Sequence, residues 1–192
     1  MPELVLASTS PYRRALLARL GVPFRCVAPG VDESALHDPS LTPHALAERL
    51  ARAKAERVAE EEPEAVIVGS DQLVAFEGRV FGKPGDERGA VEQLLAMAGS
   101  RHELITAVVV WNRGQVVEHT DVTALWMRPL GRVEIERYVA ADLPFDCAGG
   151  YKLEERGIAL FERIESADHT AIIGLPLIAV TTILRGLGFL IP

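Results

Sequence analysis

The sequence predicts a mixed α/β fold, with a twisted sheet and flanking helices arranged in two lobes around a cleft. Three observations predict it. Residues 4–6 form a short apolar run that leads directly into a helix signature. Residues 65–71 form a second buried strand, which follows a long helix. Two longer strands, about 101–111 and 115–127, are joined by a turn at residues 112–114. The 192 residues are enough for a sizeable core, and we expect a single domain over 1–192.

The first helix has clear start and stop signals. Ser10 is a good N-cap, Pro11 fits the first helical position, and Gly21 fits the C-terminal stop. Hydroxyl side chains precede the free N–H groups and the positive dipole end of this helix. The combination indicates a site for an anion.

Arg13 lies on the wrong face of this helix for a surface residue. On a helical wheel it falls between Leu16, Leu17 and Leu20, which define the buried face. An inward arginine is explained if it binds an anion, and the preceding turn then reads as a phosphate pocket. The alternative is that Arg13 and Arg14 extend along the surface with their charges in solvent.

The second helix also carries a charged residue on its apolar face. After a short strand at 24–27 and a loop at 28–41, Thr42 and Pro43 begin a helix that runs to about residue 61. Lys54 falls at the centre of its apolar face, where a lysine needs a partner. The alternative is a lysine whose stem lies along the edge of the core with its amine in water.

The rest of the chain continues the α/β alternation. The strand at 65–71 ends in a carboxylate, Asp71, and a hairpin turns at Glu77 and Gly78. The remaining elements are expected as hairpin strands at 73–76 and 79–81, helices at 86–98 and 133–140, a strand around 158–163 and a last helix from Leu175.

Composition excludes several classes of function. The net charge of −7 argues against a nucleic-acid partner, which needs a basic face. The N-terminus has no signal-peptide pattern, and the apolar stretch 172–191 is too interrupted to span a bilayer. We therefore expect a cytoplasmic protein with no membrane partner. The oligomeric state stays open, a homodimer included.

Ordinary structural roles are expected for several conspicuous residues. Cys26 and Cys147 have no ligand-like spacing and are expected as buried free thiols. The five histidines share no spacing, so surface or capping roles are expected. Core packing is expected for Trp111, Trp126, Met97 and Met127. Neither a Walker A loop nor a Gly-x-Gly-x-x-Gly motif is present, so neither common nucleotide fold is indicated.

Charged residues in unusual places nevertheless suit a nucleotide. The cations are Arg13, Arg14, Lys54, Lys83 and Lys152, and the carboxylates are Glu33 and Asp71. Several cations with two carboxylates fit a triphosphate and its Mg²⁺, which proteins bind through one or two carboxylates plus phosphate oxygens.

The same residues carry a family resemblance. The chain contains Leu-Ala-Ser-x-Ser-Pro-x-Arg-Arg, Val-Asp-Glu, Ala-x-x-Lys-Ala, Gly-Ser-Asp-Gln, Gly-Lys-Pro, Cys-Ala-Gly-Gly-Tyr-Lys and Gly-Leu-Pro-Leu, in that order. This series resembles the Maf family of nucleoside triphosphate pyrophosphatases over nearly the whole chain. The resemblance implies an inosine-triphosphatase-like fold, a divalent metal cofactor (Mg²⁺ or Mn²⁺), and hydrolysis of a nucleoside triphosphate with release of pyrophosphate.

The resemblance also implies roles for individual residues. Asp71 would accept the proton of the attacking water, and Glu33 and Asp71 would hold the metal. The implied phosphate-binding residues are Ser8, Arg13, Arg14, Lys54, Lys83 and Lys152.

Three further positions concern the base. Tyr12, Gln72 and Glu154 differ from the branch of the family that acts on dTTP and UTP, and are similar to the branch that hydrolyses 7-methyl-GTP. A Tyr12 ring could stack on the cationic 7-methylguanine, and Glu154 could accept from the N1–H and N2–H₂ groups of guanine. The alternatives are a dTTP or UTP pyrophosphatase of the same family, and a nucleotide-binding regulator of septum formation without catalysis. Without the resemblance, Glu154 reads as a solvated surface charge.

Overall fold

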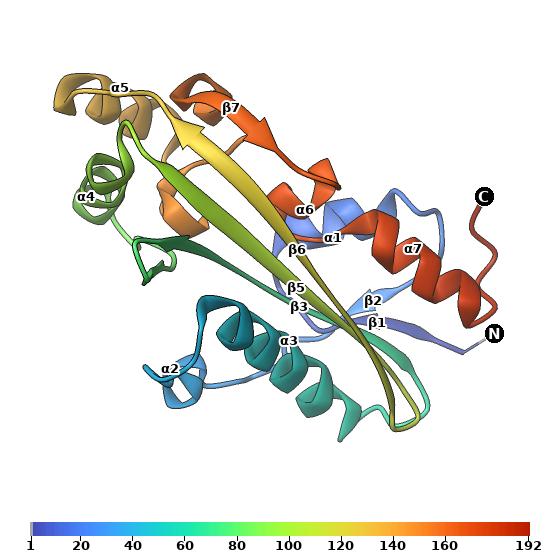
Figure 1. The fold of residues 1–192 in the computed structure, drawn as a ribbon. Coiled ribbons are helices and arrows are strands. Elements are labelled where there is room, and N and C mark those ends of the chain that lie inside the picture. The colour runs from blue at the N-terminus through green and yellow to red at the C-terminus, as the bar shows by residue number, and fades with distance from the viewer. Residues whose placement is uncertain (1) are drawn as a thin grey trace. The chain divides into compact units, whose positions relative to one another are not determined.

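The structure of the protein is a computed structural model that describes residues 2–192. Its seven strands form one mixed sheet in the order β2-β1-β3-β5-β6-β7, and β4 pairs with β3 (Figure 1). The strands are β1 (Leu4–Leu6), β2 (Arg25–Cys26), β3 (Val66–Phe76), β4 (Arg79–Phe81), β5 (Arg101–Asn112), β6 (Gln115–Met127) and β7 (Phe161–Glu165). β1 runs parallel to β2 and β3. β4 runs antiparallel to β3, and β7 runs antiparallel to β6.

The helices are interspersed among these strands along the chain. They are α1 (Pro11–Ala18), α2 (Glu33–Leu36), α3 (Pro43–Ala59), α4 (Glu87–Met97), α5 (Arg132–Asp142), α6 (His169–Ile173) and α7 (Leu177–Gly186), with short 3₁₀ turns at Ala148–Gly150 and Arg156–Leu160. The predicted α/β class, with a mixed sheet and flanking helices, is confirmed. The expected cleft stays a prediction. Among residues 2–192, no helix combines the length and the apolar character needed to cross a membrane.

Contacts divide the chain into two units. The first contains the chain up to Asp71 together with Thr106–Asp121 and Asp168–Pro192. The second contains Gln72–Ile105 and Val122–Ala167. The expectation of a single domain over the whole chain stays a prediction.

In the first unit, helices cover both faces of the sheet. The helices α1 and α7 cover one face (Figure 1). Leu4, Leu6, Val66 and Val68 belong to an apolar core together with buried residues of these two helices. On the other face α3 lies so close to β3 that a Cβ at Gly69 would stand 2.6 Å from the backbone oxygen of Ala51. Successive residues of β3 therefore face different helices.

The helix boundaries follow the expected capping chemistry. The Ser10 and Thr42 side chains accept hydrogen bonds from the backbone N–H groups of the first turns of α1 and α3. Asp86 caps α4 in the same way. The Glu77–Gly78 turn has positive φ at both residues, which is the geometry of a tight hairpin turn.

Several element expectations were wrong. β3 does not end at Asp71 but continues to Phe76, so Asp71 lies within a strand. The loop at 28–41 contains the short helix α2, because Asp32 caps it with two backbone hydrogen bonds. The strand expected from residue 158 begins at Phe161, after a 3₁₀ turn. The short helix α6 was not expected at all.

Side-chain expectations also need correction. Cys26 is exposed and Cys147 is half-buried, and both are free thiols. Met97 and Met127 are buried as expected, whereas Trp111 and Trp126 are only half-buried. Trp126 lies beneath the guanidinium groups of Arg101 and Arg163, which cover its ring by cation–π contacts.

His102 departs most from the expected surface or capping role. It is 1% exposed in the second unit, where its ring packs against Tyr151 and Phe161. Its Nε2 atom lies 3.2 Å from the Tyr151 hydroxyl. Burial lowers the pKa of His102 from 6.5 to about 4, so the ring is neutral at neutral pH.

This pKa predicts a pH-dependent stability. Between pH 4 and 6.5 the unfolded chain binds more protons at this residue than the folded chain does, so stability falls as the pH drops through that window. At pH 5 the loss attributable to His102 is about 2 kcal/mol. We expect urea unfolding to give a smaller decrease from pH 7 to pH 5 in His102→Phe than in the wild type. Equal decreases in the two proteins would contradict this assignment.

Candidate active site

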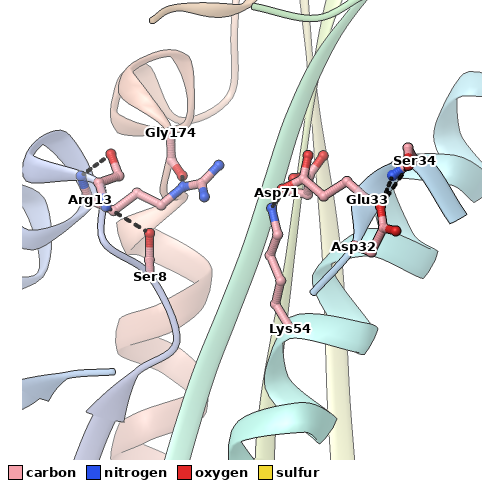
Figure 2. A network of polar contacts seen from close by, with 9 residues as sticks. Ser8, Arg13, Asp32, Glu33, Ser34, Lys54, Asp71 and Gly174 are labelled. Atoms are coloured by element: carbon pink, nitrogen blue, oxygen red, sulfur yellow. Dashed lines mark hydrogen bonds and ion pairs between the residues drawn. The ribbon is translucent and has the colours of Figure 1, made fainter. Parts of the chain in front are cut away.

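The candidate site lies beyond the carboxyl end of β1 in the first unit. β1 ends at Leu6, opposite Val68, so β3 continues past its parallel neighbour. Parallel strands commonly place ligands at their carboxyl ends, because the loops that follow them meet there. Here Ser8, in the turn into α1, and Asp71 of β3 lie at that end (Figure 2). Ser70 precedes Asp71 in the same strand.

Asp71 and Lys54 form a buried ion pair. The Nζ atom of Lys54 lies 2.6 Å from Oδ1 of Asp71, and each residue is 7% exposed. Lys54 reaches this position because α3 packs on the face of β3 to which Gly69 and Asp71 point. The expectation that Lys54 faces inward toward a partner is confirmed.

Glu33 provides a second carboxylate for the same amine. Its Oε1 atom lies 2.7 Å from Nζ of Lys54, although the Glu33 side chain is 57% exposed. Glu33 is the first residue of α2, and the Asp32 side chain caps this helix through the N–H groups of Ser34 and Ala35. The cap therefore holds Glu33 beside Lys54 and Asp71 (Figure 2).

Arg13 approaches from the other side of β3. Its Nε donates a 2.9 Å hydrogen bond to the backbone oxygen of Gly174, and its guanidinium group points toward Asp71 (Figure 2). The carboxylates of Asp71 and Glu33 are close enough to act on its charge. The prediction that Arg13 turns inward is confirmed.

The pKa of Asp71 reflects two opposing effects. Burial raises it above the usual aspartate value, and the positive charges of Lys54 and Arg13 act in the opposite direction. Burial has the larger effect, so the carboxylate binds a proton more readily than an exposed aspartate does. This is the direction required of a general base.

The N-terminal turn contributes hydroxyl groups. Ser8 is buried, and its Oγ accepts a hydrogen bond from the backbone N–H of Ser10 at 3.1 Å. Tyr12 is half-buried in the first turn of α1, and Arg14 is exposed on the same helix. The structure thus brings together Arg13, Lys54, Glu33 and Asp71, with Ser8 in the turn beside α1 (Figure 2).

The other predicted site residues belong to the second unit. The Nζ atom of Lys152 donates to the backbone oxygen of Asp142 at 3.2 Å and lies 3.8 Å from Oδ1 of Asp146. Its backbone N–H donates to the Tyr138 hydroxyl. Lys83 and Glu154 are exposed, and Gln72 is half-buried within β3. The roles expected for these four residues stay predictions.

A metal could be held by Glu33 and Asp71. Both carboxylates already lie within 2.7 Å of one positive centre, the amine of Lys54, so they can converge on a cation. Over residues 2–192 no group of three or more His, Cys, Asp or Glu side chains has the arrangement of a metal site. Two carboxylates without further protein ligands suit Mg²⁺, which keeps waters and phosphate oxygens.

Two residues of this network, Ser70 and Gly174, were not predicted as site residues. Ser70 points to the opposite face from Asp71, and its hydroxyl donates to the Gly174 oxygen at 3.1 Å. Both lie within motifs of the family resemblance, Gly-Ser-Asp-Gln and Gly-Leu-Pro-Leu. Neither residue breaks a helical or strand pattern in the sequence, because they meet through the backbone oxygen of Gly174.

A comparison with protein-family models matches residues 3–187 to the model described as Maf-like protein. The chain belongs to the Maf family. A protein of Bdellovibrio bacteriovorus named 7-methyl-GTP pyrophosphatase is 50% identical over 183 residues, covering 95% of this chain and 96% of that one. A protein of the same name from Pseudomonas syringae is 45% identical over the full length of both chains.

A solved structure supports the fold of this Maf protein. The HAM1 protein from Coxiella burnetii aligns with a TM-score of 0.55 over 97% of this chain and all of that one. The sequence identity is 14%, so this similarity concerns the fold alone.

The buried ion pair predicts that replacing Lys54 lowers the free energy of unfolding much more than replacing Arg52 on the same helix does. Lys54→Met leaves the buried Asp71 carboxylate without its nearest cation, and we expect a loss of about 3 kcal/mol in the free energy of unfolding at pH 7. Arg52→Met, on the exposed face of the same helix, removes ion pairs with Glu56 and Glu118. Its expected loss is below about 1 kcal/mol. Urea denaturation measures both, and similar losses in the two variants would contradict the account.

Proposed function

We propose that this protein is a nucleoside triphosphate pyrophosphatase that hydrolyses 7-methyl-GTP to 7-methyl-GMP and pyrophosphate. The observation that carries the proposal is the buried Asp71 carboxylate between Lys54 and Arg13, within strand β3 of a Maf protein. The names of the relatives from Bdellovibrio and Pseudomonas support the substrate.

In the proposed reaction, Asp71 accepts a proton from the water that attacks the α-phosphorus. The new bond joins the water oxygen to this phosphorus, the bond to the bridging oxygen breaks, and pyrophosphate leaves. Negative charge grows on the departing oxygens, so positive groups fixed nearby lower the barrier. Arg13 is held by the Gly174 carbonyl before the substrate arrives, which avoids the cost of reorganising it.

A divalent cation, Mg²⁺ or Mn²⁺, is part of the proposal. Glu33 and Asp71 would hold it, and it would supply neutralisation of phosphate charge. Lys54 would then pass from its two carboxylates to the phosphates. Ser8, Arg14, Lys83 and Lys152 are further proposed phosphate contacts, based on the family resemblance.

Recognition of the base is proposed for three residues. Tyr12 would stack on 7-methylguanine, whose positive charge adds about 0.5–2 kcal/mol to the contact. Glu154 would accept hydrogen bonds from the N1–H and N2–H₂ groups of guanine, and would repel the carbonyl oxygens of a pyrimidine. Gln72 is proposed as the third contact. A cytoplasmic location stays an expectation, and the oligomeric state stays open, a homodimer included. Removal of modified nucleotides is proposed as the cellular role from the family resemblance.

A substrate panel tests the proposal. Pyrophosphate release is measured from 7-methyl-GTP, GTP, dTTP and UTP with Mg²⁺ or Mn²⁺ present. We expect the highest kcat/KM for 7-methyl-GTP. A preference for dTTP or UTP would place the protein in the other branch, and no release from any of the four would favour a regulator without catalysis.

Two neighbouring glutamates, Glu154 and Glu155, allow a controlled test of guanine recognition. Glu154→Gln should lower kcat/KM for 7-methyl-GTP by about tenfold or more, because hydrogen bonds to a charged acceptor are worth about 1.5–3 kcal/mol. Glu155→Gln removes the adjacent exposed carboxylate and should change it by less than about twofold. Equal effects would remove Glu154 from its proposed role.

Asp71→Asn tests the general base. The amide keeps the shape of the side chain but cannot accept the proton, so we expect kcat to fall by at least about 100-fold. Binding of the nucleotide, measured by calorimetry, should change far less. Asp38→Asn changes a half-buried aspartate that accepts from the backbone N–H of Ser40, and this variant should retain full turnover. Retained activity in Asp71→Asn would exclude Asp71 as the base.

A further inference from the structure

The segment between α6 and α7 is held by a buried carboxylate. Asp168 is 4% exposed, and its Oδ1 accepts hydrogen bonds from the backbone N–H of Thr170 at 2.8 Å and from the Thr170 hydroxyl at 2.6 Å. Its Oδ2 accepts from the backbone N–H of Ile178 at 2.8 Å. One side chain therefore joins the beginning of α6 to the first turn of α7.

This connection takes the place of a local helix cap. The residue before α7 is Pro176, which offers no side-chain hydrogen bond to the helix. The free N–H groups of the first turn are satisfied from α6 instead, since Leu177 N–H donates to the Thr170 hydroxyl and Ile178 N–H donates to Asp168. The two helices are thus fixed to one another on both sides of Gly174.

Gly174 is the point where this corner meets the candidate site. Its N–H donates to the oxygens of Thr170 and Ala171, and its carbonyl accepts from Nε of Arg13 and from the Ser70 hydroxyl. Its φ of 129° is a conformation that other residues rarely adopt. The Arg13 guanidinium group is therefore oriented by a carbonyl whose direction the corner determines (Figure 2).

We propose that Asp168 is a positioning residue for Arg13. It fixes the Gly174 carbonyl through Thr170 and the start of α7, and this carbonyl holds the Arg13 side chain toward Asp71. Arg13 has several rotatable bonds, and an unanchored guanidinium group would lose much of its orientation. The value of this orientation for phosphate binding rests on the proposed function, but the orientation itself does not.

NMR of the ligand-free protein tests the positioning directly. A hydrogen-bonded Arg13 Nε–H should give a cross-peak that persists at neutral pH, whereas the exposed Arg14 Nε–H should exchange rapidly with solvent. Asp168→Asn keeps the size of the side chain but cannot accept at both ends, so we expect the Arg13 signal to be lost or broadened. Val180→Ala, a core truncation in α7 outside this network, should keep it.

The outcome decides the proposal. An Arg13 Nε–H signal in Asp168→Asn with the exchange rate of the wild type would overturn it, and so would loss of the signal in Val180→Ala as well. If Asp168→Asn does not fold, Thr170→Val serves instead, because it removes the hydroxyl that links Asp168 to Leu177 while keeping the side-chain volume. In Thr170→Val, loss or broadening of the Arg13 Nε–H signal supports the proposal, and a signal with the exchange rate of the wild type overturns it.

A kinetic cycle separates this inference from the proposed function. Asp168→Asn should raise KM for 7-methyl-GTP at least tenfold in the wild-type background and less than twofold in the Arg13→Gln background, because its effect passes through Arg13. Additive effects on KM would show a purely structural role and would overturn the proposal. Failure of the proposed function would instead appear as absent pyrophosphate release in the wild type, with the NMR result unchanged.

Discussion

The burial of the Asp71 carboxylate is the constraint on which the rest of the site depends. An ionised carboxylate loses its hydration when it is 7% exposed, and only a close cation can compensate. Lys54 provides that compensation from α3, and Arg13 adds to it from α1. A pair of this kind contributes little net stability, since desolvation offsets the attraction. In the proposed function, its value lies in holding charges at fixed positions for the nucleotide.

The geometry of β3 explains how two helices supply these cations. Successive side chains of a strand point to opposite faces, so Ser70 meets the Gly174 carbonyl while Asp71 meets Lys54. The close approach of α3 depends on Gly69, because a side chain there would collide with the backbone of α3. One strand thereby organises the anchor of Arg13 on one side and the partner of Lys54 on the other.

Much of this fold could be predicted from the sequence because its signals are local. Caps at Ser10 and Thr42 set the starts of helices, and the hairpin turn at Glu77 and Gly78 set the register of β4. The strand end expected at Asp71 was wrong, because an acidic residue followed by glutamine resembles a strand terminus. The sequence does not reveal that Lys54 neutralises the carboxylate from α3 and that the strand can therefore continue.

The candidate site could be predicted in part for the same reason. Arg13 and Lys54 stand out on their helical wheels, since a charge on an apolar face breaks a periodic pattern. Glu33 and Asp71 stand out as carboxylates at expected loop and strand ends, whereas their roles came from the family resemblance. Asp168 could not be found, because it accepts from the backbone N–H of Ile178, 10 residues away. Contacts through backbone groups leave no pattern in the sequence.

In the proposed mechanism, Asp71 is a buried base whose charge is balanced by Lys54 and Arg13. A carboxyl ¹³C NMR titration of Asp71 in the ligand-free protein tests this assignment. We expect a pKa above the ordinary aspartate value, and a further increase when Lys54 is replaced by methionine. A pKa of Asp71 at or below the ordinary value, or one that does not respond to the loss of Lys54, would contradict it.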